Sequence, residues 1–220
     1  MRAYHFIDCQ YGLDNIRRKR LKVSRLQDLN DPFELLALEL PDKRVRNAFS
    51  EVKEQLHKNR GILCFSEKWS NPVMWSHYAE KHRGLCLVFE IPEKLLASIS
   101  YSQKRLKDVL DKLFSNLQEV QEDAMARILT TKFSHWKYEK ERRLFVGLDT
   151  PDEFGNHFVD FSEQLKLVGV VVGPRSAITR ADLSAVLSHA NLAHPIKVFK
   201  ARLAFNSFRV VKNQDANLWQ

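Results

Sequence analysis

The sequence lacks the cross-links that hold many small domains together. Its three cysteines, Cys9, Cys64 and Cys86, are widely spaced and form no CxxC pair, so neither a disulfide framework nor a zinc knuckle is encoded. Gly and Pro number only seven each, which excludes collagen-like and low-complexity chains. A chain of 220 residues can bury a sizeable core without such aids. We therefore expect a protein of a reducing compartment.

Long apolar runs are also missing. The longest, at 167–172, is far shorter than the ~20 residues that a membrane-spanning helix needs. Asp8 interrupts the apolar start of the chain after a few residues, so we find no signal-peptide core. These features predict a cytoplasmic protein without a membrane partner.

Several enzyme classes lack their motifs here. The absence of GxGxxG, P-loop, HExxH and GxSxG sequences disfavours Rossmann dehydrogenases, P-loop NTPases, zincins and α/β-hydrolases. His77 and His82 are five residues apart, an offset that points two helical side chains in different directions. Because no third ligand is near, we expect no metal site.

Positive charge is what the sequence has in excess, with a formal net charge of +8. From position 174 to 212, seven basic residues face one acid, and acids gather elsewhere in the chain. A second basic group comprises Arg17, Arg18, Lys19, Arg20, Lys22 and Arg25. Such a distribution favours a polyanionic partner, either nucleic acid or the phosphates of a nucleotide. The alternative is a solvated basic face that serves solubility.

The apolar pattern predicts a mixture of strands and helices. We expect strands at 2–7, 21–24, 61–66, 85–91, 141–148, 167–172, 196–203 and 205–211. We expect helices at 13–20, at 42–59 with Gly61 as the C-cap, at 72–82 and at 179–189. A helical insertion at about 93–132 is predicted by an apolar stripe at Leu106, Val109, Leu110, Leu113, Phe114, Leu117 and Val120.

These elements do not alternate regularly as βαβ units. The predicted fold class is therefore α+β, a single domain over 1–220 with a central mixed, largely antiparallel sheet flanked by helices. The strand at 85–91 is apolar on both faces, which places it near the centre of the sheet.

Three clusters contain more polar and aromatic residues than a core needs. Tyr4 and His5 lie on the opening strand, where a lone His is usually structural. The sequence NDPFE at 30–34 is either a plain turn or an acidic loop beside a site. On the helix that follows Pro72, one expected face carries Trp75, Tyr78, Ala79 and His82, and another carries Met74, His77 and Lys81. Such faces predict a pocket that stacks on a flat ring.

A fourth cluster, WKYEKERRLF at 136–145, contains paired acids. If the strand begins early, Glu139 and Glu141 share one face with their carboxylates roughly 7 Å apart. Such a pair suits binding of sugar hydroxyls or stabilisation of a developing positive charge. The alternative is a strand end closed by salt bridges with Lys140, Arg142 and Arg143.

At these clusters the chain resembles a bacterial family known as domain of unknown function 2971, some of whose members accompany abortive-infection loci directed against phage. The matching segments are the opening strand, NDPFE at 30–34, CFSE at 64–67, MWSHYAEKHRGLCLVFE at 74–90 and WKYEKERRLF at 136–145. They cover about two-thirds of the chain. The genomic company of this family suggests an antitoxin or another regulatory protein as a partner.

More distantly, the order of elements is similar to the ADP-ribosyltransferase superfamily, especially its toxins that modify DNA. The resemblance implies that His5 matches the His or Arg of the first strand, that Ser66 or Tyr78 matches the middle position, and that Glu141 or Glu139 matches the catalytic Glu. The spacing is looser than in that superfamily, and no clear Ser-Thr-Ser motif occurs.

The same resemblance implies that NAD is the substrate, with nicotinamide stacked on Tyr78 or Trp75. The residues expected near NAD are Tyr4, Asn30, Asp31, Ser66, Trp75, His77, Tyr78 and His82. The basic surface favours a nucleic-acid acceptor, whereas water as acceptor would give an NAD glycohydrolase. Two alternatives stay open: a non-enzymatic ligand-sensing or interaction domain, and a Mg²⁺-dependent nuclease that uses Asp31, Glu34 and Glu141.

Overall fold

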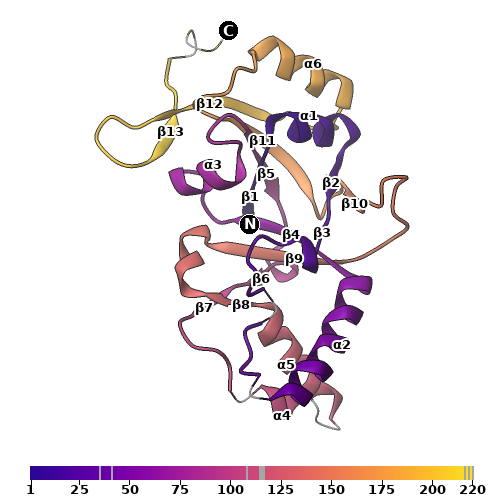
Figure 1. Cartoon of the computed structure of the whole chain (residues 1–220). Coiled ribbons are helices and arrows are strands. Elements are labelled where there is room, and N and C mark those ends of the chain that lie inside the picture. The colour runs from indigo at the N-terminus through magenta and orange to yellow at the C-terminus, as the bar shows by residue number, and fades with distance from the viewer. Residues whose placement is uncertain are drawn as a thin grey trace.

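A nine-stranded mixed sheet runs through the molecule (Figure 1). The computed structural model describes residues 1–34, 36–40, 42–107, 109–113, 117–215, 217 and 219. The strand order is β13-β12-β11-β5-β1-β4-β9-β6, and β3 pairs with β4 beside this path. The bounds are β1 Arg2–Ile7, β3 Ser24–Arg25, β4 Arg60–Ser66, β5 Leu85–Glu90, β6 Ala97–Ser98, β9 Glu141–Gly147, β11 Lys166–Val172, β12 Lys197–Leu203 and β13 Val210–Lys212.

Most neighbouring strands of this sheet are antiparallel. Among the strand pairs within the described ranges, β11–β12 is parallel and the others in the large sheet are antiparallel. Two small sheets accompany it: β2 (Arg20–Lys22) pairs antiparallel with β10 (Phe158–Asp160), and β7 (Ser100–Ser102) pairs parallel with β8 (Thr131–Phe133). The predicted α+β class with a mixed central sheet is confirmed.

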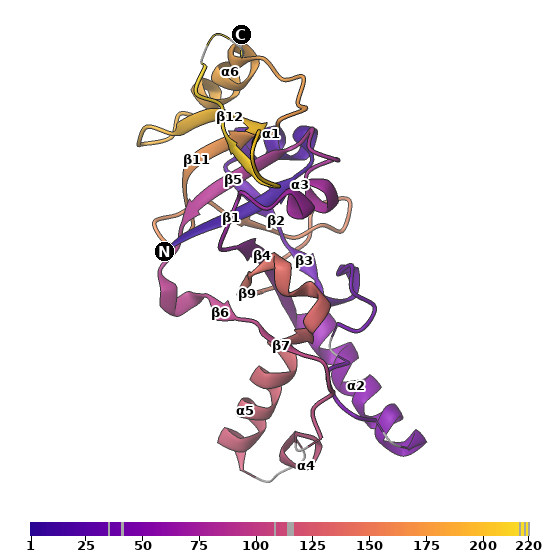
Figure 2. The ribbon, with the colours of Figure 1, turned by 90° about the vertical axis from the view of Figure 1, so that its left-hand side faces the viewer.

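Six α-helices lie in the described part of the chain: α1 Cys9–Arg18, α2 Lys43–Asn59, α3 Pro72–Tyr78, α4 Leu110–Leu113, α5 Gln118–Leu129 and α6 Arg180–Ala190. Figure 1 and Figure 2 both show α2, α4 and α5 at the end of the molecule opposite to α1 and α6. A separate apolar cluster, which includes Phe49, Val109 and Ile128, fills the space between these three helices and the sheet. Among the described residues, we find no helix with the length and apolarity needed to cross a lipid bilayer.

Strand β5 separates two apolar layers because successive side chains of a strand point to opposite faces. Leu85, Leu87 and Phe89 belong to the cluster that contains the buried side chains of α1 and α6. Cys86 and Val88 belong to the cluster that contains α3. The strand lies between β11 and β1, so the prediction of a central strand apolar on both faces is confirmed.

The segment 93–132 is not one helical insertion. It contains the 3₁₀ turn Glu93–Leu95, then β6 and β7, and only afterwards α4 and α5. Val109 and Leu113 are buried as the apolar stripe predicted, but Leu117 precedes α5 and is 66% exposed. Phe114, the one aromatic residue of the stripe, lies outside the described residues. Ser100–Ser102 instead pair with Thr131–Phe133, so the two short helices of this segment lie between two paired strands.

Three expected boundaries are also wrong. Gly61 does not cap α2, because β4 begins at Arg60 and Gly61 lies inside that strand. The helix expected to reach His82 ends at Tyr78. The strand expected at 205–211 is limited to Val210–Lys212, and the loop before it leaves Phe205 and Phe208 almost fully exposed.

Candidate functional site

Three neighbouring strands bring distant parts of the sequence to one level. Tyr4 of β1 pairs with Ser66 of β4, and Ser66 pairs with Glu141 at the start of β9. Because adjacent strands are about 4.8 Å apart, these three positions span roughly 10 Å. The pairing between β1 and β4 extends to this one pair, and a cavity opens beside it.

The cavity has a volume of about 260 Å³. Its walls come from β1, the loop that follows β3, β4, α3, β8 and the segment that leads into β9. Seven of the eleven residues expected in catalysis or near NAD line it: Tyr4, His5, Asn30, Ser66, Tyr78, Glu139 and Glu141. We call this cavity the glutamate pocket.

Local structure fixes Glu139 in this pocket. It ends the 3₁₀ helix Ser134–Glu139, and the following Lys140 adopts a left-handed conformation with φ 47°. The Ser66 hydroxyl donates to the Glu139 carbonyl oxygen at 2.6 Å, and the Asn71 amide donates to the Tyr138 carbonyl oxygen at 2.9 Å. Glu139 and Glu141 are therefore joined by a turn. Strand β9 begins at Glu141, as expected for the strand at 141–148, and the early start that would place both glutamates on one strand face does not occur.

The floor of the pocket is a buried cluster of charged side chains. The Arg143 guanidinium, which is fully buried, donates to both oxygens of Glu141 at 2.7 and 3.1 Å and to Glu34 at 2.7 Å. The Lys132 ammonium donates to Glu139 at 2.7 Å and to Glu141 at 3.1 Å. Each of these five side chains is at most 5% exposed.

This cluster carries an uneven charge. Three carboxylates face two cations, so one negative charge is in excess when all five groups are ionised. A buried charge without an opposite partner is costly, and it favours a site where a ligand or transition state supplies positive charge.

The two pocket glutamates differ in their hydrogen bonds. Glu141 receives three, two from Arg143 and one from Lys132. Glu139 receives one from Lys132 and one from the Tyr78 hydroxyl, which itself accepts from the Asn30 amide at 2.7 Å. An ionised carboxylate offers about four acceptor positions, so Glu139 retains more capacity for a ligand hydroxyl.

Their pKa values move in opposite directions. Burial raises the pKa of Glu139, and the hydrogen bonds and charge of Lys132 and the bond from Tyr78 offset this only in part. Burial would also raise the pKa of Glu141, but Arg143 and Lys132 outweigh it and hold that pKa below its usual value. Glu141 is thus a fixed anion, whereas Glu139 is the carboxylate better able to exchange a proton.

His5 also lines the pocket, and its ring is neutral. Its Nδ1 atom is 2.9 Å from the Cys64 carbonyl oxygen, and because a carbonyl can only accept, Nδ1 carries the hydrogen. Burial lowers the pKa of His5, and the bond to Cys64 offsets this only in part. The Nε2 atom of this tautomer is left as an acceptor.

Four residues expected near a ligand lie outside the pocket lining. Trp75 is fully buried in the core, with its indole nitrogen bonded to the Trp69 carbonyl oxygen at 2.6 Å, so it cannot stack on a ligand. Asp31 is also buried, and its carboxylate closes the turn by accepting from the Phe33 amide at 2.9 Å. The plain-turn interpretation therefore applies to Asp31.

The two histidines of the expected helical faces are separated from the pocket for different reasons. His77 lies on the exposed side of α3, where its ring stacks near that of Tyr138 at 6.3 Å. His82 follows α3 in a run of left-handed residues, Glu80–His82, and so is not on the helical face of Tyr78. The turn that follows His82 passes so close to β1 that a Cβ on Gly84 would lie 2.2 Å from a main-chain oxygen of that strand, so this position requires glycine.

Sequence reasoning missed the roles of Lys132 and Tyr101 in this cluster, whereas the salt-bridge alternative had included Arg143, which pairs with Glu141. Lys132 looked like part of a helical insertion, yet β8 places it across from Tyr101 of β7. The Tyr101 hydroxyl accepts from the Glu141 amide at 2.8 Å, and burial raises the pKa of Tyr101 to about 12. The signal that could have found Lys132 is that it is the lone charged residue in the stretch 128–133. A lysine buried at such a position has to pair with acids.

The basic group at 17–25, which we call the basic segment, ends close to the pocket, although none of its cations lines the pocket. Ser24 and Asp28 line the pocket, and Asp28 pairs with Arg25 at 3.0 Å. Arg18 pairs with Asp14, and Arg20 lies over the Phe158 ring. The exposed cations of the segment are Arg17, Arg18, Lys19 and Lys22.

Comparison of the chain with protein-family models, with curated protein sequences and with solved structures found no match.

Proposed function

We propose that this protein is an ADP-ribosyltransferase-like enzyme that breaks the bond between nicotinamide and ribose in NAD. The observation that carries the proposal is the glutamate pocket, whose buried charged floor has one carboxylate in excess of its cations. The positions that the resemblance assigns to catalysis, His5, Ser66 or Tyr78, and Glu139 or Glu141, all line this one cavity.

The chemistry of NAD suits the pocket. Its nicotinamide ring is flat and positively charged, and Tyr4 and Tyr78 provide aromatic surface beside the anionic floor. A volume of about 260 Å³ is slightly below the usual range for whole small-molecule ligands. The pocket therefore accommodates the nicotinamide end of the molecule, and the remainder of NAD, with its phosphates, extends out of the pocket.

We assign different roles to the two glutamates. Glu139 contacts the ribose, because its remaining acceptor positions can bind a ribose hydroxyl and its charge stabilises the oxocarbenium-like transition state. Glu141, already bonded three times, is a positioning residue that holds Lys132 and Arg143 in place. The resemblance left Glu139 and Glu141 as alternatives, and the unequal hydrogen bonding of the two carboxylates favours Glu139.

The bond changes follow from these roles. The glycosidic carbon–nitrogen bond breaks, and its electron pair leaves with neutral nicotinamide. An acceptor lone pair then forms the new bond to the same ribose carbon and the acceptor loses a proton. Glu139 takes that proton, since its raised pKa makes it the better base of the two carboxylates near neutral pH.

The exposed cations at Arg17, Lys19 and Lys22 favour a nucleic-acid acceptor in the cytoplasm, with water as the competing acceptor. In this proposal the enzyme is a toxin or anti-phage effector, held inactive by an antitoxin or regulatory protein. A nuclease has less support, because the Arg143 guanidinium already bridges Glu34 and Glu141. Among the described residues, no group of three or more acids, histidines or cysteines is arranged to hold a metal ion.

Chromatography of nicotinamide tests the proposal. The protein is incubated with NAD alone, with single-stranded or duplex DNA and with RNA. We expect release that depends on a nucleic acid, and a loss of about 100-fold or more in Glu139→Gln. Glu163→Gln, at an exposed glutamate paired with Lys166, is the matched control. No release by the wild type under any condition would overturn the proposal, and binding of NAD without turnover would favour the ligand-sensing alternative.

A further inference from the structure

A second cavity, of about 240 Å³, adjoins the glutamate pocket. Lys132 lines both cavities, and the second one is otherwise formed by Phe33, Leu36, Ala37, β7 with the loop that follows it, and β8. Tyr101 and Lys132 are opposite each other and form hydrogen bonds with the glutamates. Ser102 and Phe133, one position further along β7 and β8, line the second cavity and not the glutamate pocket.

Two partly exposed aromatic rings line this cavity. Phe33 is 56% exposed and Phe133 is 42% exposed. Phe133 is held by the His135 ring, which stacks on it with centroids 4.5 Å apart and an interplanar angle of 30°. A flat apolar surface kept in place and open to solvent is suited to stacking on a planar ligand.

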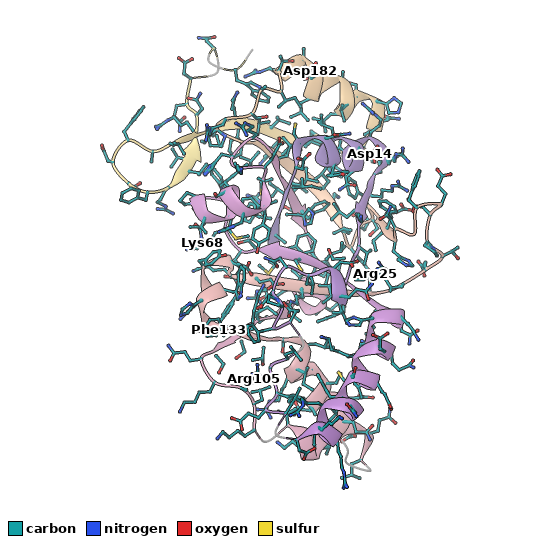
Figure 3. All side chains as sticks on the ribbon, in the orientation of Figure 1. Asp14, Arg25, Lys68, Arg105, Phe133 and Asp182 are labelled. Atoms are coloured by element: carbon teal, nitrogen blue, oxygen red, sulfur yellow. The ribbon has the colours of Figure 1, made fainter. Side chains whose placement is uncertain are left out.

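Positive charge surrounds these rings. Lys104 and Arg105 are exposed at the cavity, and the Arg105 guanidinium lies 5.6 Å from the centroid of the Phe33 ring. The Ser102 hydroxyl accepts from the Lys104 amide and so closes the turn that presents both cations. Among the described residues that line the cavity, none is acidic. Figure 3 shows Arg105 and Phe133 in the same lower part of the molecule, below β9.

We propose that this cavity binds one nucleotide unit, with the base stacked on Phe133 and the phosphate bound by Lys104 and Arg105. Aromatic surface for a base combined with cations for the backbone is the arrangement that binds single-stranded nucleic acid without base-edge readout. The proposal rests on the proposed function for its choice of partner, and it places the nucleic acid beside Lys132 rather than only on the basic segment at Arg17–Arg25.

Fluorescence anisotropy with a labelled ten-nucleotide thymidine strand, in the absence of NAD, tests this binding. Stacking of one base on an aromatic ring contributes about 1–3 kcal/mol, so Phe133→Ala should weaken binding by about 5- to 150-fold. Phe154→Ala, at an aromatic residue 78% exposed on another loop, should bind like the wild type. Arg105→Gln should reduce the slope of log affinity against log salt concentration by about 0.7, the value for one phosphate contact on a single strand.

Competition identifies the source of the nucleotide. Displacement of the labelled strand by thymidine monophosphate at similar concentrations would assign the site to free nucleotides, and displacement only by unlabelled strand would assign it to nucleic acid. Wild-type affinity in both Phe133→Ala and Arg105→Gln would overturn the inference, as would the absence of any binding by the wild type. Strand binding is measured without NAD and nicotinamide release is measured separately. Binding that depends on Phe133 without any release would overturn only the proposed function, whereas release without such binding would overturn only this site.

Discussion

Replacement of Arg143 by Met should destabilise the protein far more than the same change at its neighbour Arg142. Arg143 is fully buried and makes four hydrogen bonds, three to Glu34 and Glu141 and one to the Leu129 carbonyl oxygen. Met preserves most of the side-chain length but leaves the carboxylate of Glu34 buried without this cation. Removal of one partner from a buried ion pair costs about 3–5 kcal/mol.

Arg142 provides the matched control on the same strand. It pairs with Glu67 at 2.7 Å, but the two side chains are 20% and 36% exposed. Such surface pairs contribute only about 0–1 kcal/mol because water and salt screen them. Urea denaturation followed by circular dichroism measures both. With a slope of about 2–3 kcal/mol per molar urea, the midpoint of Arg143→Met should fall by about 1–2.5 M, and that of Arg142→Met by much less.

A second variant tests the cause of this loss. Addition of Glu34→Gln to Arg143→Met removes the stranded carboxylate, so the double variant should be more stable than the sum of the two single changes predicts. If Arg143→Met unfolded at the same urea concentration as Arg142→Met, the buried charge cluster would not carry the energy that we assign to it. Strict additivity of Glu34→Gln and Arg143→Met would contradict the proposed coupling.

Three further predictions concern the turn beside the pocket and the pocket walls. In thermal denaturation, Gly84→Ala should lower the free energy of unfolding by about 1–3 kcal/mol, because a Cβ there would lie 2.2 Å from a main-chain oxygen. Gly147→Ala is the control: its Cβ meets nothing within 4 Å, so the free energy of unfolding should change by less than about 0.5 kcal/mol. The His5 ring should titrate below its ordinary 6.5 in proton NMR, because burial disfavours its charged form, and a pKa at or above 6.5 would contradict this. Tyr78→Phe should reduce nicotinamide release about 10-fold or more, since it removes the hydroxyl that orients the Glu139 carboxylate. Tyr11→Phe, at a ring that is 66% exposed, should leave nicotinamide release unchanged.

The sequence was most informative where hydrophobic periodicity is strong. The strand at 85–90, which is apolar on both faces, and the helices expected at 42–59 and 179–189 each follow from local patterns, and the structure contains all three. Long-range pairing is what such patterns do not contain. The pairing of β7 with β8 replaced an expected helix, and it is this pairing that places Lys132 beneath the glutamates.

Part of the candidate pocket could be predicted from local sequence patterns. Polar residues on strands, such as Tyr4, His5 and Ser66, point to a site because a core strand rarely carries them. The residues on α3 were assigned with less success, because the helix ends at Tyr78 and the left-handed run that follows moves His82 away. Three consecutive non-glycine residues with positive φ are not predictable from propensity, since tertiary contacts at Gly84 impose them.

The most direct test of the central claim is the amount of free nicotinamide released from NAD by the wild-type protein and by Glu139→Gln, measured side by side at equal concentrations of folded protein. The account predicts release by the wild type in the presence of its nucleic-acid acceptor and a loss of about 100-fold or more in the variant. Equal release by both proteins would contradict the role of Glu139, and no release by either would contradict NAD cleavage itself.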